Sequence, residues 1–267
     1  VYDIQCIFVG NMLHYLGQEL HENGYGMLIC DSCNDAEIEK KNLQFLLSRK
    51  VDGILVFAVG LDGIFLEAAK RAEVPVVLID RSFRNEEFDC VEIDNRAAMR
   101  RAANKLISFG HRRIAVIASN IEYTGMERMK GFEDALREAE ITVPDEYRIR
   151  GKHSFELGYQ GMKSLLELPE PPTAVILGNY DTTLGGVMAA NELGFSCPRD
   201  LSLIGFDDLL MSKVIRPRLW FVVQPMEEMS KRAVNMLLNR ISHENEGSPL
   251  RISFSAAISE GNSIRKI

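Results

Sequence analysis

Apolar runs that end in polar residues recur along this chain, and a helical pattern follows each of them. The sharpest case is residues 201–208, Leu-Ser-Leu-Ile-Gly-Phe-Asp-Asp, where an apolar run ends in two carboxylates. Short, continuously apolar runs that alternate with helices indicate parallel strands buried on both faces. Ligands of such sheets bind outside the carboxyl ends of the strands. The sequence therefore predicts an α/β fold with a small-molecule site at those strand ends.

The whole chain can be divided on this pattern. Strands are expected at residues 4–9, 26–30, 51–57, 76–79, 91–93, 114–118, 174–177, 201–206, 219–223 and 250–257. Helices are expected at residues 12–22, 35–48, 64–72, 95–109, 125–139, 154–168, 182–193 and 226–241. The series starts again near Asp94, and 267 residues exceed one average domain. Two similar lobes are the natural expectation, and the late elements can return to either lobe.

Composition excludes several classes of protein. The net charge of −7 argues against a chain that grips phosphate backbones by itself, because such domains are usually basic. The five cysteines are an odd number and suggest no disulfide framework. Cys30 and Cys33 have the spacing of a redox motif, yet they follow a strand, so inert thiols are the favoured interpretation. With no signal segment and no apolar run near the roughly 20 residues of a membrane span, the expected location is the cytoplasm, away from membranes.

The polar residues at strand ends are the first candidates for a binding site. One of Asp207 and Asp208 is expected to cap the following turn, and Asp208 is favoured for that role. Asp207 is then an acceptor for a ligand's hydroxyl or amine groups, with capping equally open. Asn179 offers a donor and acceptors to a ligand, and turn formation or capping is again equally open. Asp181 looks like the cap of the helix that follows.

Arg128 is a second kind of candidate, on a helix with Met129, Phe132 and Leu136. A solvated helix face is the ordinary role for such an arginine. Near the helix start, its planar fork could instead reach a ligand at the strand ends.

Signals for catalysis are poor. The five histidines are scattered and have no metal-binding spacing. The chain has neither a Gly-x-Ser-x-Gly nucleophile turn nor a GxxxxGK[ST] phosphate loop. No enzymatic activity, cofactor or metal is therefore predicted.

Several segments coincide, in order, with one protein family. They are Val-Asp-Gly-Ile-Leu-Val at 51–56, Pro-Val-Val-Leu-Ile-Asp-Arg at 75–81, Gly-His-Arg-Arg-Ile-Ala at 110–115, Glu-Arg-Met-Lys-Gly-Phe at 127–132, residues 198–208 and Gln224-Pro225. Together they resemble the effector-binding domain of LacI/GalR transcription regulators, over essentially the whole chain. The Gly-His-Arg-Arg-Ile segment and the Ile-Gly-Phe-Asp-Asp segment are the specific parts.

The resemblance implies a fold like that of periplasmic sugar-binding proteins. Two Rossmann-like lobes with parallel sheets would be joined by three crossovers, with a ligand cleft between them. The N-terminal lobe would be residues 1–93 plus 226–253, and the C-terminal lobe residues 94–225 plus 254–267. Arg128, Asn179 and Asp207 fall on effector-binding positions, and Asp80 lies at a strand end lining the cleft. His153 stands where relatives often carry an aromatic ring.

Two departures from the family accompany the resemblance. The helix-turn-helix headpiece is absent from this chain, so DNA is expected to be bound only through a segment outside it. The connection around Gly10-Asn11 is also shorter than in relatives. The first hypothesis is thus the sensing and dimerising part of a bacterial regulator that binds a sugar-like effector, with residues 64–66 as a candidate dimer surface. The alternative is a solute-binding protein of a sugar transporter, which the missing secretion signal, the unpaired cysteines and Gly110-His-Arg-Arg-Ile114 disfavour.

Overall fold

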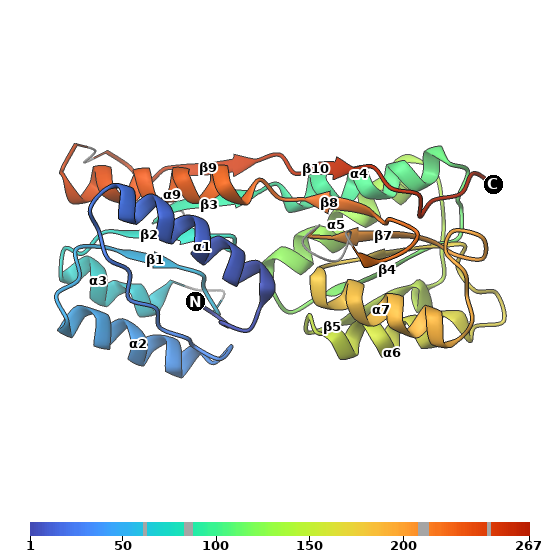
Figure 1. Cartoon of the computed structure of the whole chain (residues 1–267), viewed down its shortest axis with the longest axis horizontal. Helices are drawn as coiled ribbons and strands as arrows, with labels where there is room; N and C mark the ends of the chain where they lie inside the picture. Colours follow the sequence, from blue (N-terminus) through green and yellow to red (C-terminus); the bar gives the residue numbers. More distant parts are fainter. Residues whose placement is uncertain (61–62, 83–87, 208–213, 245–246) are drawn as a thin grey trace. The chain divides into compact units, whose positions relative to one another are not determined.

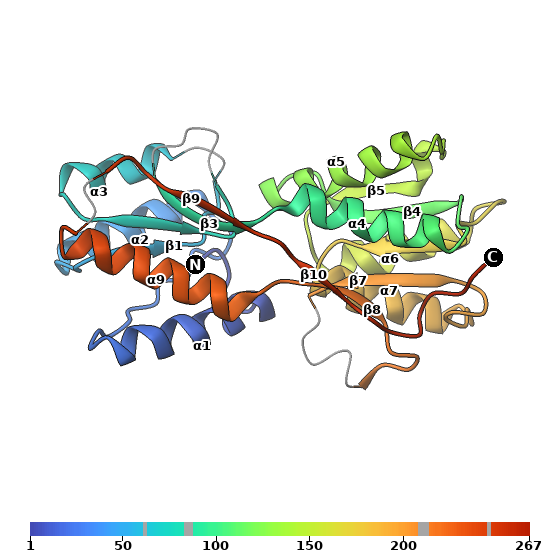
Figure 2. The ribbon, with the colours of Figure 1, turned by 90° about the horizontal axis from the view of Figure 1, so that it is seen from above.

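The computed structural model describes residues 1–60, 63–82, 88–207, 214–244 and 247–267. It divides into two compact units, which we call unit 1 and unit 2. Unit 1 comprises Val1–Ile93 and Pro225–Phe254, and unit 2 comprises Asp94–Gln224 and Ser255–Ile267. The chain therefore passes from one unit to the other three times (Figures 1 and 2). Asp208, which the sequence favoured as a cap, lies outside the described residues.

In the part of unit 1 that the structure describes, four strands form a parallel sheet in the order β1-β2-β3-β9. Its strands are β1 (Ile54–Val56), β2 (Val76–Ile79), β3 (Asp89–Ile93) and β9 (Arg251–Phe254). Its helices are α1 (Ile7–Glu22), α2 (Ala36–Ser48), the short 3-10 turn η1 (Ile64–Leu66), α3 (Glu67–Arg71) and α9 (Met226–Ile241). Leu66, proposed from sequence for a dimer surface, is fully buried in the core of this unit and cannot serve there.

The strand predicted at residues 4–9 is wrong, because Ile7 already begins helix α1. The reason is the spacing of the buried side chains, Phe8, Val9, Met12, Leu16 and Leu20, which fits one face of a helix and not a strand. Gly10 and Asn11 lie within this helix. The shortened strand-to-helix connection inferred around them is therefore also wrong.

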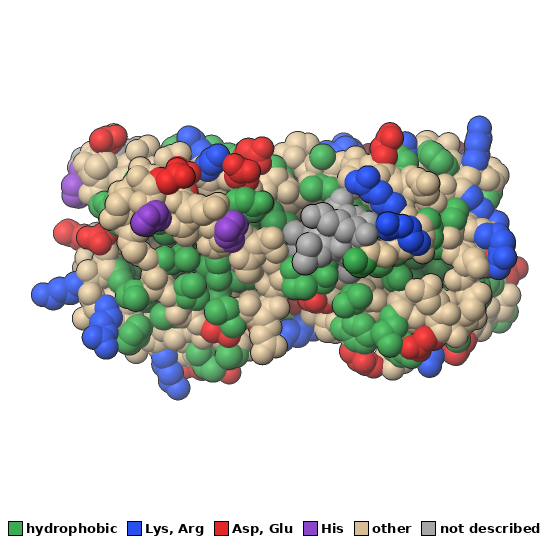
Figure 3. All heavy atoms as spheres, in the orientation of Figure 1, with side chains coloured by type: hydrophobic (Ala, Val, Ile, Leu, Met, Phe, Trp, Pro, Cys, Tyr) green, Lys and Arg blue, Asp and Glu red, His purple; other side chains and the backbone are tan. Residues whose placement is uncertain are grey.

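Residues 26–30, the second predicted strand, are not assigned to either sheet. They line an apolar groove of about 340 Å³ together with side chains of α1 and α9, including Leu16 and Leu237. Leu28 and Ile29 are exposed there. Figure 3 shows hydrophobic side chains gathered on this face of unit 1, beside α1.

The described residues of unit 2 form a sheet of six strands in the order β10-β8-β7-β6-β4-β5. All are parallel except β10, which pairs antiparallel with β8. The strands are β4 (Ile114–Ser119), β5 (Arg148–Gly151), β6 (Ala174–Leu177), β7 (Ser202–Phe206), β8 (Trp220–Val223) and β10 (Ala257–Ser259). The helices are α4 (Asn95–Ser108), α5 (Tyr123–Glu138), the 3-10 turn η2 (Asp145–Tyr147), α6 (Phe155–Leu166) and α7 (Tyr180–Glu192). Strands β4, β6 and β7 are buried along their whole length, as expected for central strands covered on both faces.

The Gly-His-Arg-Arg-Ile segment fastens the C-terminal tail to unit 2. Gly110 follows α4 with a φ of +97°, and a Cβ there would overlap the backbone oxygen of Ile267. His111 is fully buried between Thr173 Oγ1 at 2.8 Å and the Arg265 carbonyl at 3.1 Å. This specific part of the motif therefore has a packing role.

Candidate functional site

The five parallel strands of unit 2 end along one edge of its sheet, and a polar side chain stands at or just after each end. These residues are Ser119 and Glu122 after β4, His153 after β5, Asn179 after β6, Asp207 after β7 and Gln224 after β8. The carboxyl ends of parallel strands are where ligands of open α/β sheets bind. The sequence prediction of polar side chains at this edge is met by the structure.

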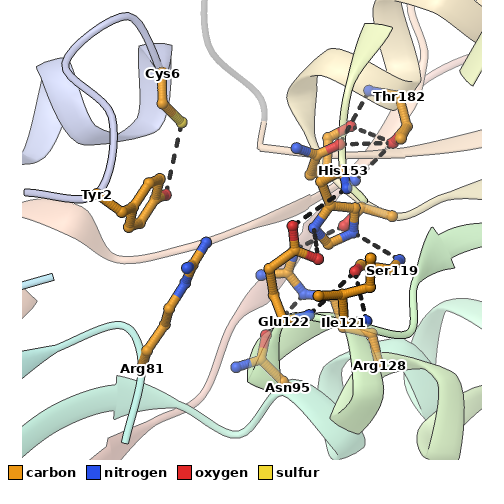
Figure 4. Close-up of polar contacts among 12 residues, drawn as sticks. Tyr2, Cys6, Arg81, Asn95, Ser119, Ile121, Glu122, Arg128, His153 and Thr182 are labelled. Carbon is orange, nitrogen blue, oxygen red and sulfur yellow. Dashed lines mark hydrogen bonds and ion pairs between the residues drawn. The ribbon is translucent and has the colours of Figure 1, made fainter. Parts of the chain in front are cut away.

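Arg128 reaches this edge from the second turn of α5 and is almost completely buried. Its Nε donates to Asn95 Oδ1 at 2.7 Å, and its Nη1 donates to the Gly178 carbonyl at 2.6 Å. The guanidinium carbon lies 3.7 Å from the centre of the Phe206 ring. A buried guanidinium held by neutral acceptors and stacked on a ring is a positioned group, and a solvated surface role is wrong for it (Figure 4).

His153 and Glu122 face each other at the end of β4 (Figure 4). The ring Nε2 of His153 accepts a hydrogen bond from the Ser119 N–H at 3.1 Å, which requires an unprotonated Nε2. Its Nδ1 lies 3.8 Å from Glu122 Oε2, and its backbone N–H donates to Glu122 Oε1 at 3.3 Å. These contacts fix the orientation of the His153 ring. The polar groups lie against the edge of the ring and not against its face.

Asn179 is the N-cap of α7, so the capping role that the sequence left open beside ligand binding is present in the structure. Its Oδ1 accepts from the Thr182 N–H at 3.0 Å, while Thr182 Oγ1 accepts from the Asn179 N–H at 3.0 Å, so the two form a capping box. Asp181 was expected to be the cap, and that expectation is wrong, because it already lies in the first turn. Capping uses the oxygen of Asn179 and does not use its amide nitrogen.

Asp207 lies at the end of β7 with a φ of +66°, and its side chain is buried. Its Oδ1 accepts from Gln224 Nε2 at 2.8 Å. A left-handed backbone is uncommon at a non-glycine residue, and aspartate is one of the residues that adopt it more readily. The same backbone conformation occurs in unit 1 at Asp80, whose φ is +68°.

Asp80 belongs to unit 1, at the end of β2. Its carboxylate is buried, and its Oδ2 lies 3.9 Å from Arg81 Nε. Arg81 donates from Nη1 to the Ala58 carbonyl at 3.1 Å, and its guanidinium carbon lies 3.8 Å from the centre of the Tyr2 ring. Burial raises the pKa of Tyr2 well above its ordinary value.

The structure thus gathers Arg128, Asn179, Asp207 and His153 along one sheet edge of unit 2, and Asp80 belongs to unit 1. Sequence reasoning missed Asn95, Glu122 and Arg81 as polar groups at these positions. Glu122 carries no motif that could have revealed it, whereas Gln224 stood in the Gln-Pro pair used for the family resemblance. Within the described ranges no cluster of three metal-binding side chains is found, and no helix there is long and apolar enough to cross a membrane.

Residues 103–264 match the model of the periplasmic binding protein-like domain. The chain is 31% identical over 247 residues to the HTH-type transcriptional repressor PurR of Klebsiella pneumoniae, covering 91% of this chain and 72% of that protein. The crystal structure of the transcription regulator CcpA of Lactococcus lactis is similar over 99% of this chain and 97% of that one, at 25% identity and a TM-score of 0.90. The transcriptional regulator CelR in complex with cellobiose matches over 96% of this chain and 79% of that one, at 27% identity and a TM-score of 0.87.

Fold and site edge together define a periplasmic-binding-protein-like domain with two α/β units. The chain belongs to the LacI family of transcriptional regulators, as its relatives and structural neighbours show. The PurR relative is a transcriptional repressor and CcpA is a transcription regulator, so the regulator hypothesis holds against that of a transporter's solute-binding protein.

Proposed function

We propose that this chain is the effector-sensing part of its regulator, and that the sheet edge of unit 2 holds a small polar metabolite of the sugar class. Arg128, Asn179, Asp207 and His153 would contact the effector from unit 2, and Asp80 would contribute from unit 1. The observation that carries this proposal is the Arg128 guanidinium, buried on the Phe206 ring and oriented by Asn95 and the Gly178 carbonyl. The solved structure of one similar regulator, CelR, is a complex with cellobiose, which supports the sugar class.

The proposed response is a shift between arrangements of unit 1 and unit 2. An effector that favours one arrangement by differential affinity shifts the population toward it, and tight binding without such a difference would shift nothing. DNA would be bound through a helix-turn-helix segment outside this sequence, of the kind for which the PurR relatives are named. We further propose that the protein acts as a cytoplasmic homodimer with no enzymatic activity. None of its five cysteines, all of which lie in the described ranges, is joined in a disulfide, which suits a reducing compartment.

A screen of sugars by thermal shift tests the proposal, followed by titration calorimetry of any compound that stabilises the protein. At 100 times Kd a ligand adds about 2.7 kcal/mol to the free energy of unfolding, which a melting curve detects readily. Arg128→Lys keeps the charge but loses the planar fork, and Asp207→Asn keeps a side chain that tolerates positive φ. Both should weaken binding about tenfold or more, and Arg137→Lys, on the exposed side of α5, should not.

Two results would contradict this assignment. If both Arg128→Lys and Asp207→Asn bound the effector with wild-type affinity, the sheet edge of unit 2 would be ruled out as the binding site. An equal loss of affinity in Arg137→Lys would show that the variants act through general damage to α5.

A further inference from the structure

Resting on the proposed function, we propose that Glu122 and Gln224 select the effector through two acceptor oxygens. These oxygens would take hydrogen bonds from hydroxyl or amine groups. The site would then bind a neutral or cationic compound rich in donors and discriminate against the phosphorylated form of the same compound.

Glu122 stands at the N-cap position of α5 but makes no capping hydrogen bond. Its side chain is nine-tenths buried, and its Oε1 already accepts from the His153 N–H. Its Oε2 is buried and has no hydrogen-bond partner among the described residues. Buried carboxylate oxygens are nearly always paired, because an unpaired one loses its hydration without compensation. A donor from outside the chain would complete this pair.

His153 does not neutralise Glu122. Its Nδ1 is 3.8 Å from Oε2, which is beyond hydrogen-bond distance. Because its Nε2 accepts the Ser119 N–H, the ring cannot carry protons on both nitrogens while that bond exists. The carboxylate therefore faces a neutral ring and keeps its capacity to accept.

Gln224 presents the second acceptor. Its side-chain orientation is set by Asp207, because an ionised carboxylate only accepts and so must face the amide nitrogen. The Oε1 of Gln224 is left buried and has no hydrogen-bond partner among the described residues. The two unpartnered oxygens stand after β4 and β8, at the same carboxyl edge as Arg128.

Charge at this edge argues against a phosphorylated ligand. The Arg128 guanidinium is engaged by Asn95, the Gly178 carbonyl and the Phe206 ring. A phosphate group carries about −1.5 to −2 charges at pH 7 and would bring them to an edge that contains the carboxylates of Glu122 and Asp207. Hydroxyl groups would donate to those carboxylates without repulsion.

Glu122→Gln is the test, since it is isosteric and leaves Oε1 to accept from His153 while placing an amide donor where Oε2 was. Its matched control is Glu138→Gln, the same change at the exposed far end of α5. The probes are glucose, glucosamine, ribose and cellobiose, with glucose 6-phosphate and ribose 5-phosphate as charged partners. We expect a neutral or amino compound to stabilise the wild type, and Glu122→Gln to lower its affinity about ten- to a hundredfold. The ligand-free melting temperature of Glu122→Gln should equal or exceed that of the wild type.

Several outcomes would overturn the inference. Tighter binding of a phosphorylated probe than of its neutral partner would do so, as would unchanged affinity in Glu122→Gln. A lowered ligand-free melting temperature of Glu122→Gln with unchanged affinity would show that Glu122 serves only to hold His153 in place. In these cases effector binding itself still stands. Failure of every probe to bind the wild type would instead count against the proposed function.

Discussion

Replacing Asn179 separates its capping role from a role in ligand binding. Asn179→Ala removes the oxygen that accepts from the Thr182 N–H and leaves that buried donor unpaired. Losing an N-cap of this kind costs about 1 kcal/mol of stability, within a range of roughly 0.5–2 kcal/mol. Thr182 Oγ1 keeps its bond to the Asn179 carbonyl, so a larger loss is not expected. In a domain of this size the melting temperature should fall by about 2–4 °C.

Asn179→Asp is the comparison that isolates the amide nitrogen. Aspartate caps helices as well as asparagine does, and its charge suits a helix N-terminus, so stability should be equal to the wild type or a few tenths of a kcal/mol higher. The aspartate lacks the amide donor, so effector affinity should fall even though the helix is intact.

Urea unfolding followed by tryptophan fluorescence measures both variants. Trp220 is the only tryptophan and is buried in β8, so its signal reports on unit 2. The reasoning would be refuted if Asn179→Asp lost as much stability as Asn179→Ala. Wild-type effector affinity in Asn179→Asp would leave Asn179 as a cap only.

Two further predictions concern stability. Burial lowers the pKa of His111, so the unfolded chain binds its proton at a higher pH than the folded chain does. The contribution of His111 to the free energy of unfolding should therefore be fully present above about pH 6.5 and should decline as the pH falls below that value. His111→Gln should reduce this pH dependence, as measured by urea unfolding at several pH values. Gly131→Ala would place a Cβ against the backbone oxygen of Arg96, where α5 crosses α4, and calorimetry should show a loss of about 1–3 kcal/mol or more. A wild-type melting curve for this variant would contradict the close helix contact.

Much of the fold could be predicted because its signals are local. The apolar runs at β2 and β6 and the amphipathic pattern of α9 gave element bounds that agree with the structure to the residue. The error at residues 4–9 arose because a short apolar run fits a strand and a helix equally well, and only the continuation of the pattern to Leu20 decides. Strand β5 was missed because its four residues, Arg-Ile-Arg-Gly, include one apolar side chain and lie at the edge of the sheet. The segment predicted as one strand at 250–257 is two, β9 and β10, in different sheets.

The candidate site was accessible to sequence reasoning in position but not in detail. Strand ends placed Asn179 and Asp207 at the sheet edge without revealing their hydrogen bonds. Whether Asn179 or Asp181 caps α7 depends on a one-residue difference in where the helix begins, which local patterns do not resolve. The proposed role of Glu122 rests on its Oε2 atom, which has no hydrogen-bond partner among the described residues. Whether this carboxylate is paired depends on the nearby end of β4 and on His153, which is about 30 residues away in the sequence.

The way the chain threads its two units bears on the order in which they form during synthesis. Residues 94–224 supply nearly all of unit 2 as one continuous stretch, whereas unit 1 lacks α9 and β9 until residues 225–254 have been made. Domains generally fold as units as they emerge, and joining distant segments carries a loop-closure entropy cost. We therefore expect unit 2, although it is encoded later, to complete its fold first on the ribosome. Residues 1–93 should remain incompletely folded, with their partial sheet exposed, until residues 225–254 have been synthesised.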